Sequence, residues 1–150
     1  MAQTLIWANG EVRLQPLGAM IDGLRIKLAD GRFVEPLAIA PWADEPKNQS
    51  LPNILLGMRG EWPCVPFGTE EPLSLPSRWP STLGVSVPAH GYGSNEVWDV
   101  KNQDNALLAS ISYPSDSPIE GLRRIVRPMP NGIAIELAVT AREDCRIPIV

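Results

Sequence analysis

The sequence predicts an all-β protein, an antiparallel β-sandwich, and three observations point to this fold class. Apolar and polar residues alternate with a period of two in several segments, which is the pattern of half-buried strands. Turn dipeptides such as Asp30-Gly31 and Asn131-Gly132 separate these segments. The 16 prolines and 12 glycines among 150 residues leave little room for long helices. A chain of this length fits one β-sandwich domain over residues 1–150.

The first predicted hairpin lies in residues 23–42. Leu24, Ile26 and Leu28 point to one side of an extended segment, and the basic residues between them point to the other. Asp30-Gly31 then supplies a tight turn before a second extended segment.

Two later segments read as strands in the same way. The segment 106–113 has one apolar face, formed by Leu107, Ala109, Ile111 and Tyr113. The turn at Asn131-Gly132 joins residues 122–128 to a strand whose buried face is expected to contain Ile133, Ile135, Leu137 and Val139. The arginines of 122–128 are expected to be largely solvated.

Between these hairpins, residues 41–96 form a long irregular region rich in Pro, Gly, Trp and Ser. Loops this long in a compact protein are functional or disordered, and the interspersed apolar residues argue against simple disorder. The last residues, 143–150, are expected to form an apolar strand without a polar tail. That end predicts that the chain continues or that another polypeptide covers this edge, which leaves a homo-oligomer open.

Charge and composition exclude some classes of partner. The net charge is −4 and the isoelectric point is near 5.0, so binding to nucleic acid or to an anionic membrane has no electrostatic support. The sequence has no signal-peptide pattern and no apolar window of membrane-spanning length, and we expect a cytoplasmic protein. Cys64 and Cys145 fit no metal spacing and are interpreted as free, buried thiols, with a disulfide left open. We expect no metal and no cofactor.

Four stretches resemble one family in order and spacing. They are "RLQPLGAMIDGLRI…GRFVEPLAIAPW" (13–42), "MRGEWPCVPFG" (58–68), "PAHGYGSNEVWDV" (88–100) and the segment 112–149. Together they resemble the aldose 1-epimerases, the galactose mutarotase-like proteins. The resemblance implies a β-supersandwich of roughly twice this length, so residues 1–150 would be either one sandwich domain or the N-terminal half of a larger one.

The resemblance also implies a reaction and its partner, a small-molecule aldose. Members of this family interconvert the anomers of free aldoses without a cofactor. An acid protonates the ring oxygen, a base removes the anomeric hydroxyl proton, the ring opens, and closure gives either anomer. Their acid and base groups include a histidine that matches His90, a second histidine further along and a late glutamate, and the last two have no match in residues 1–150.

His90 is the only histidine in the chain, and it lies on a glycine-rich loop. Imidazole can give and take a proton near neutral pH, which suits a general acid in ring opening. Gly91 follows directly and would let the ring approach a bound sugar with little obstruction. His90 is therefore the candidate catalytic residue, set against the alternative of a structural or surface histidine.

Three further residues are candidates for substrate binding by the same resemblance. Arg59 can fork onto sugar hydroxyls or a phosphate, or it can be a surface arginine in a turn. Trp62 can stack on a sugar or pack against Pro63. Asn95 can contact substrate or hold its own loop through the side-chain amide.

Other residues of the motifs have simpler expected roles. Trp98 falls in a strand-like run and is expected in the core. A solvated role is expected for the acids Glu61, Asp99, Glu120 and Asp144. Two residues depart from the family pattern: Ser94 stands where members that act on hexose phosphates carry an arginine, and Glu61 replaces a usual glycine.

Three functions follow from these observations. The first is an aldose 1-epimerase-like isomerase of carbohydrate metabolism with His90 as general acid. The second is a non-catalytic carbohydrate-binding or accessory β-protein, motivated by the departures and the unmatched partner groups. The third is a structural subunit that pairs with another chain through its C-terminal edge.

Overall fold

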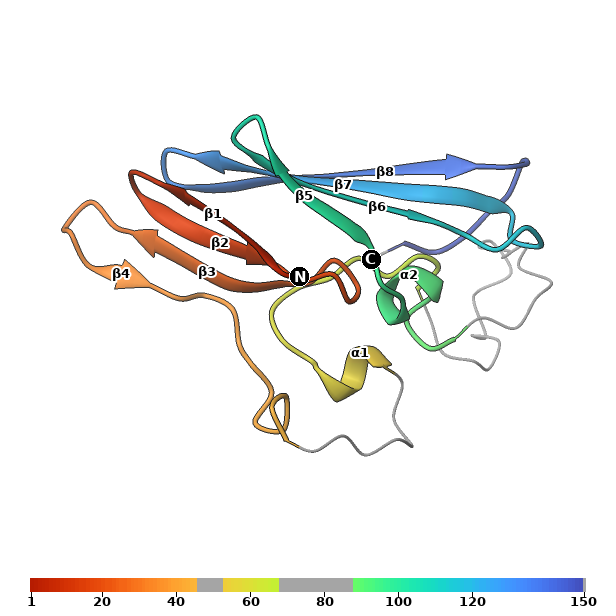
Figure 1. The fold of residues 1–150 in the computed structure, drawn as a ribbon, viewed down its shortest axis with the longest axis horizontal. Helices are drawn as coiled ribbons and strands as arrows, with labels where there is room; N and C mark the ends of the chain where they lie inside the picture. The colour runs from red at the N-terminus through yellow and green to blue at the C-terminus, as the bar shows by residue number, and fades with distance from the viewer. Residues whose placement is uncertain (46–52, 68–87, 150) are drawn as a thin grey trace.

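The computed structural model describes residues 1–45, 53–67 and 88–149, which form two four-stranded antiparallel sheets and very little helix (Figure 1). The first sheet contains β1 (Gln3–Trp7), β2 (Gly10–Leu14), β3 (Ile21–Lys27) and β4 (Phe33–Val34). The second contains β5 (Asp99–Gln103), β6 (Ala106–Ser112), β7 (Ile119–Met129) and β8 (Gly132–Ala141). The helices are α1 (Asn53–Leu56) and α2 (Tyr92–Asn95).

Each sheet is a meander in which consecutive strands are hydrogen-bonded neighbours. The predicted hairpin at Asp30-Gly31 is confirmed, because β3 pairs with β4 and Gly31 takes the left-handed conformation that the turn needs. Asp104 and Asn105, with φ of 51° and 58°, join β5 to β6 through a two-residue turn with φ positive at both positions. The hairpin of β1 and β2, which turns at Ala8 and Asn9, was not predicted.

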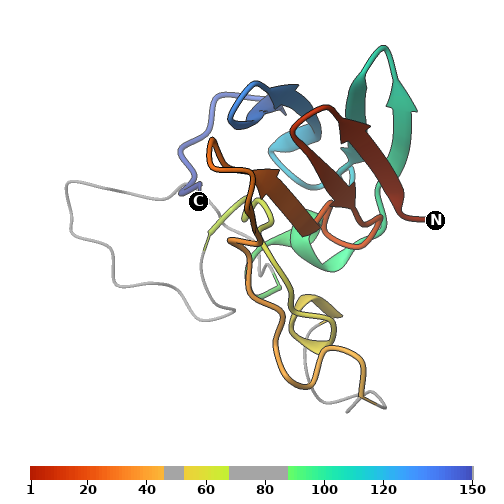
Figure 2. The same ribbon diagram turned by 90° about the vertical axis from the view of Figure 1, so that its left-hand side faces the viewer.

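The two sheets lie next to one another (Figure 2), and the buried side chains of both form one hydrophobic core. β1 lies closest to β5 and β6, and the side-chain amide of Asn102 donates to the Thr4 carbonyl across this contact at 2.8 Å. Trp98, just before β5, is buried in the core as predicted. The core residues that the first sheet supplies are Leu5, Val12, Leu14, Ile21 and Leu24, and the second sheet adds Leu107, Ala109, Ile119, Leu122 and Val126.

The predicted apolar face of residues 106–113 is confirmed, since Leu107, Ala109 and Tyr113 are buried and Ile111 is half-buried against the core. The predicted burial of the apolar face of β8 is wrong in degree. Its residues Ile133, Leu137 and Val139 are only half-buried, and Ile135 is 45% exposed. β8 is the last strand of its sheet and pairs only with β7, so it lacks a neighbour on its outer side.

The expectation that the arginines of β7 are solvated is wrong for Arg124, which is only 1% exposed. Its register partners Ala109 and Leu137 lie on the same, inward face of the sheet. Nη1 donates to the carbonyl of Ala19 at 2.7 Å, and Nη2 pairs with the carboxylate of Glu61. Glu61 is therefore only in part the solvated acid that the sequence predicted, since its side chain is 44% exposed and pairs with this buried guanidinium. Burial lowers the pKa of Arg124 and the Glu61 carboxylate opposes that shift.

The C-terminal residues differ from the prediction, because residues 143–149 form no strand. This segment runs back to the loop at Phe67, whose amide donates to the Pro148 carbonyl at 2.8 Å, and Ile147 packs against the core.

Cys64 and Cys145 are free thiols as predicted, and Cys145 is half-buried. No helix within the described ranges is long and apolar enough to cross a membrane. Within the predicted irregular region 41–96, residues 46–52 and 68–87 lie outside the described residues.

Neighbouring residues of β1 provide a test of the two-sheet core. Leu5 is 6% exposed and packs in the core, whereas Ile6 on the opposite face is 71% exposed. We expect Leu5→Ala to lower the free energy of unfolding by about 2–5 kcal/mol, because it leaves a cavity between the sheets. Ile6→Ala should change it by about 0.5 kcal/mol or less. Urea denaturation measures both, and equal effects would contradict this arrangement of the first sheet.

Candidate functional site

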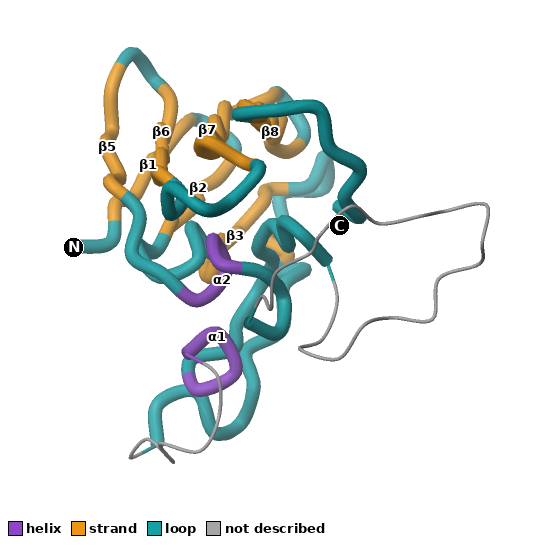
Figure 3. The backbone as a smooth tube through the Cα atoms, turned by 90° about the vertical axis from the view of Figure 1, so that its right-hand side faces the viewer, coloured by secondary structure: helices purple, strands orange, loops and turns teal. Residues whose placement is uncertain are grey.

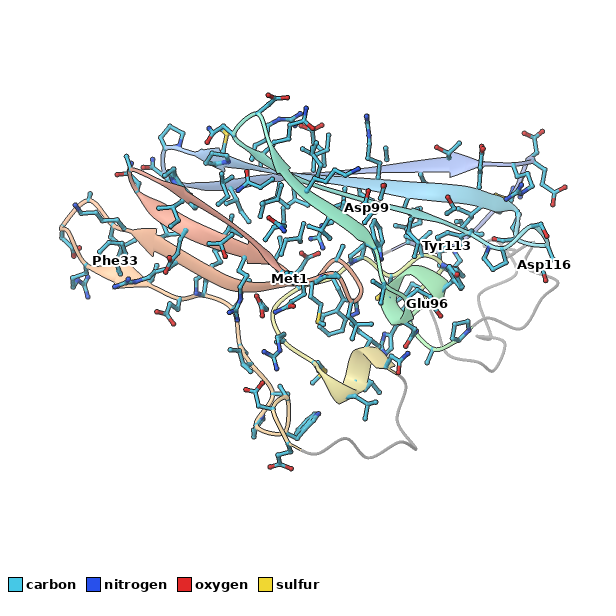
Figure 4. The ribbon with its side chains drawn as sticks, in the orientation of Figure 1. Met1, Phe33, Glu96, Asp99, Tyr113 and Asp116 are labelled. Atoms are coloured by element: carbon cyan, nitrogen blue, oxygen red, sulfur yellow. The ribbon has the colours of Figure 1, made fainter. Side chains whose placement is uncertain are left out.

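Two of the four family-like stretches contribute loops, residues 58–67 and 88–98, that meet near the end of β6 (Figure 4). Tyr113 connects them, since its hydroxyl donates to the carbonyl of Val65 at 2.6 Å and accepts from the amide of Gly93 at 3.1 Å. Burial raises the pKa of Tyr113, so the phenol keeps the proton that this bond requires. The sequence placed Tyr113 in the core and gave no sign of this hydroxyl contact.

Ser94 makes a second connection between the loops. Its buried hydroxyl oxygen lies 2.8 Å from the Pro63 carbonyl oxygen and 2.6 Å from the His90 carbonyl oxygen. The single hydroxyl hydrogen is shared by these two acceptors. Gly91 also fits against the other loop, because a Cβ atom there would lie 2.4 Å from the carbonyl oxygen of Val65. The glycine after His90 is thus required by the close approach of two backbones.

His90 lies at this junction with its ring half-buried. Its φ of 67° is left-handed, which is uncommon for a residue other than glycine and clusters at functional sites. Nδ1 lies 3.8 Å from the sulfur of Cys64, within the distance of a hydrogen bond to sulfur. The ring of Trp62 stands edge-on to the imidazole, with centroids 6.3 Å apart and planes at 78°. The structure therefore brings together two of the predicted residues, His90 and Trp62.

Cys64 was not among the predicted site residues, although its sulfur is a polar contact of the imidazole. The thiol is buried, and burial is the main reason that its pKa is raised. The hydroxyl of Ser94 and the indole of Trp62 oppose that shift, whereas the charge of Glu61 adds to it. The sulfur thus remains a neutral thiol near neutral pH, a weak hydrogen-bond donor rather than a nucleophilic thiolate.

Arg59 is held by the protein itself. Nε donates to the Gly57 carbonyl at 3.2 Å, and Nη2 donates to the Ala43 carbonyl at 3.0 Å and to Asp44 at 2.7 Å. Nη1 lies 3.7 Å from Asp22, and the side chain is 14% exposed. These contacts tie the loop of 58–67 to residues 43–44 and to β3, so most of the guanidinium is already occupied.

Asp22 is the buried anion of this cluster, and sequence reasoning missed it. Its carboxylate accepts a bidentate pair of bonds from Arg13 at 2.7 and 2.8 Å and one from Gln15 at 2.6 Å. The available signal was an acid inside the apolar run 19–24, because a buried carboxylate needs partners. Asp22 therefore places Arg59 beside β3, at the start of the loop that carries Trp62 and Cys64.

Asn95 uses its side-chain amide inside the loop. Nδ2 donates to the carbonyls of Ala89 at 2.8 Å and Gly91 at 2.9 Å, and Oδ1 accepts from the amide of Ile54 at 3.3 Å. These bonds hold the backbone on both sides of His90 and join α2 to α1, which lie near one another (Figure 3). Of the two roles considered for Asn95, these contacts are those of a residue that shapes the loop.

Within the described parts of the chain, no group of three or more His, Cys, Asp or Glu side chains is placed to hold a metal ion. The chemistry available at the junction is proton transfer by His90 beside an aromatic face. The half-exposed Glu61 side chain, which pairs with Arg124, precedes Trp62 on the same loop.

The chain was compared with protein-family models, with curated proteins and with solved structures, and nothing matches in any of the three comparisons. The likeness to aldose 1-epimerases therefore stands on the residues of the four stretches alone.

The connection through Tyr113 can be tested by removing one oxygen atom. Tyr113→Phe leaves the carbonyl of Val65 and the amide of Gly93 without their buried partner, and we expect a loss of about 1–3 kcal/mol in the free energy of unfolding. Tyr92→Phe is the matched control, because the Tyr92 hydroxyl makes no hydrogen bond among the described residues and its ring packs on Tyr113. Denaturant titration of both variants measures the difference, and equal stability would contradict the proposed link.

Proposed function

We propose that this chain is an aldose 1-epimerase-like carbohydrate-processing protein, part of a galactose mutarotase-like supersandwich, with His90 as the general acid that protonates the ring oxygen of an aldose. The observation that carries the proposal is the junction itself. Two loops that are far apart in sequence each contain a family-like motif, and they meet at His90, the only histidine of the chain.

The environment of His90 supports this role on chemical grounds. A half-buried imidazole can lose part of its hydration and still reach a bound ligand. Hydrogen bonds on three successive carbonyls hold the left-handed conformation of His90. Ser94 donates to the carbonyl of His90 itself, and the side-chain amide of Asn95 donates to the carbonyls of the residues before and after it. Such strain persists where surrounding contacts enforce it, and it fixes the direction of the ring. Trp62 places an apolar ring next to the imidazole, where it can lie along one face of a sugar.

Ring opening also needs a base for the anomeric hydroxyl. One imidazole cannot donate to the ring oxygen and accept from the anomeric hydroxyl at the same moment. The resemblance assigns the second role to a further histidine and a glutamate that have no match in residues 1–150. The proposal is therefore that His90 supplies one half of an acid–base pair in the full natural chain.

A second function, non-catalytic carbohydrate binding, is favoured by the contacts of Arg59 and Asn95. Both residues match positions that contact substrate in the family, but here both donate their hydrogen bonds to other groups of the protein. In this function the aromatic ring of Trp62 and the edge of His90 bind a sugar without transferring a proton.

Polarimetry of the full natural chain tests the catalytic function. We expect acceleration of glucose or galactose mutarotation, and His90→Asn should reduce kcat by roughly 10²–10⁴-fold, the usual contribution of a general acid. Asparagine tolerates a left-handed backbone, so this variant preserves the loop. Glu120→Gln, at an exposed position of β7, is the control and should leave the rate unchanged. No acceleration with any common aldose would refute catalysis, and full activity of His90→Asn would refute the role of His90.

Calorimetry distinguishes the second function. Saturable binding of an aldose without any acceleration of mutarotation is the expected result for a binding protein. Trp62→Ala should then weaken binding by about 10-fold, because it removes the aromatic face, whereas Trp42→Ala should have no effect. Absence of binding to every aldose tested would contradict this function.

A further inference from the structure

The contact between Cys64 and His90 joins two side chains whose backbones are both held in place. The residues on either side of Cys64 are anchored, since the carbonyl of Pro63 faces the Ser94 hydroxyl and that of Val65 accepts from Tyr113. The carbonyl of His90 faces the same Ser94 hydroxyl. The 3.8 Å between the sulfur and Nδ1 is therefore fixed by the same hydrogen bonds that hold the loops together.

The direction of the hydrogen bond between Cys64 and His90 depends on which atoms can donate a hydrogen and which can accept one. A neutral imidazole has one nitrogen that donates and one that accepts. The hydroxyl hydrogen of Ser94 is directed to a backbone carbonyl, and the Trp62 indole nitrogen can only donate. A thiol sulfur accepts only weakly, whereas the unprotonated nitrogen of a neutral imidazole is a good acceptor, so we expect the thiol hydrogen of Cys64 to point to Nδ1. The raised pKa of the buried thiol agrees with this direction, because the sulfur keeps its hydrogen.

We propose that Cys64 is a positioning residue that holds neutral His90 in the tautomer with its hydrogen on Nε2, by donating its thiol hydrogen to Nδ1. The Nε2–H group then points away from Cys64 and is the one presented to a ligand. The transfer of a proton from Nε2 to a sugar ring oxygen requires the imidazolium form of His90, because a neutral imidazole is too weak an acid, and it rests on the proposed function. The tautomer itself does not, and it can be measured in the protein without any sugar.

The presence of one histidine makes the test direct. With ¹⁵N-labelled histidine, the chain gives one pair of imidazole nitrogen signals. At a pH where the ring is neutral, we expect an acceptor-type shift for Nδ1 and a protonated-type shift for Nε2. Cys64→Ala should move both signals toward the averaged values of a tautomer mixture, and Cys64→Ser, which restores a donor, should move them back. Cys145→Ala is the matched control and should change neither signal.

Two results would overturn the proposal. One is a wild-type spectrum in which Nδ1 carries the hydrogen, which needs no variant and so does not depend on whether Cys64→Ala folds. The other is an unchanged pair of signals in Cys64→Ala, with a backbone amide spectrum that shows a folded protein.

Activity of the full natural chain gives a separate result. Cys64→Ala should lower kcat by on the order of 10-fold with little change in KM, the size of effect seen when a group that orients an imidazole is lost. Loss of tautomer control in a chain that shows no mutarotation would support the positioning role and refute the proposed function. Mutarotation by the wild-type protein, together with an unchanged His90 tautomer in Cys64→Ala, would support the proposed function and refute the positioning role of Cys64.

Discussion

The buried guanidinium of Arg124 is the constraint on which the arrangement of this chain depends. It projects from β7 into the interior and binds the carbonyl of Ala19, in the connection between β2 and β3, and the carboxylate of Glu61. A charge that is almost fully removed from water is tolerated only with such partners. One side chain therefore ties the second sheet to the first sheet and to the loop that carries Trp62 and Cys64. The position of the candidate site relative to the sheets follows from this pairing.

The loops of the site are held mainly by hydrogen bonds between polar side chains and backbone groups of the protein. Ser94 and Asn95 bond to backbone carbonyls around His90, and Tyr113 bonds to both loops. Each of these groups is buried and would destabilise the fold if it lost its partner. The result is an irregular region with little room to move near His90, which suits a side chain that must be aimed at a ligand. Among the family-like residues of this junction, His90 and Trp62 keep surfaces that internal hydrogen bonds do not occupy.

Arg59 shows why a motif does not define a role by itself. Its position in the motif suggests contact with substrate, yet it pairs with Asp22 and Asp44, and two backbone carbonyls accept hydrogen bonds from its Nε and Nη2 atoms. Cys64 is the opposite case, because nothing in its sequence context marks it, and its sulfur is the atom that contacts the imidazole. In both cases the deciding contacts come from residues distant in the chain, so a reading of local patterns could not include them.

The sequence by itself determined the β class, the hairpin at Asp30-Gly31, the apolar face of β6 and the burial of Trp98, because these depend on alternation and turn chemistry within a few residues. It also singled out His90 as the one imidazole on a glycine-rich loop. Only the tertiary structure decided that Arg124 is buried, that β8 remains half-exposed and that Cys64 faces His90. The physical reason is that burial and hydrogen bonding are properties of neighbours in space, and the neighbours of these residues lie tens of positions away in the chain.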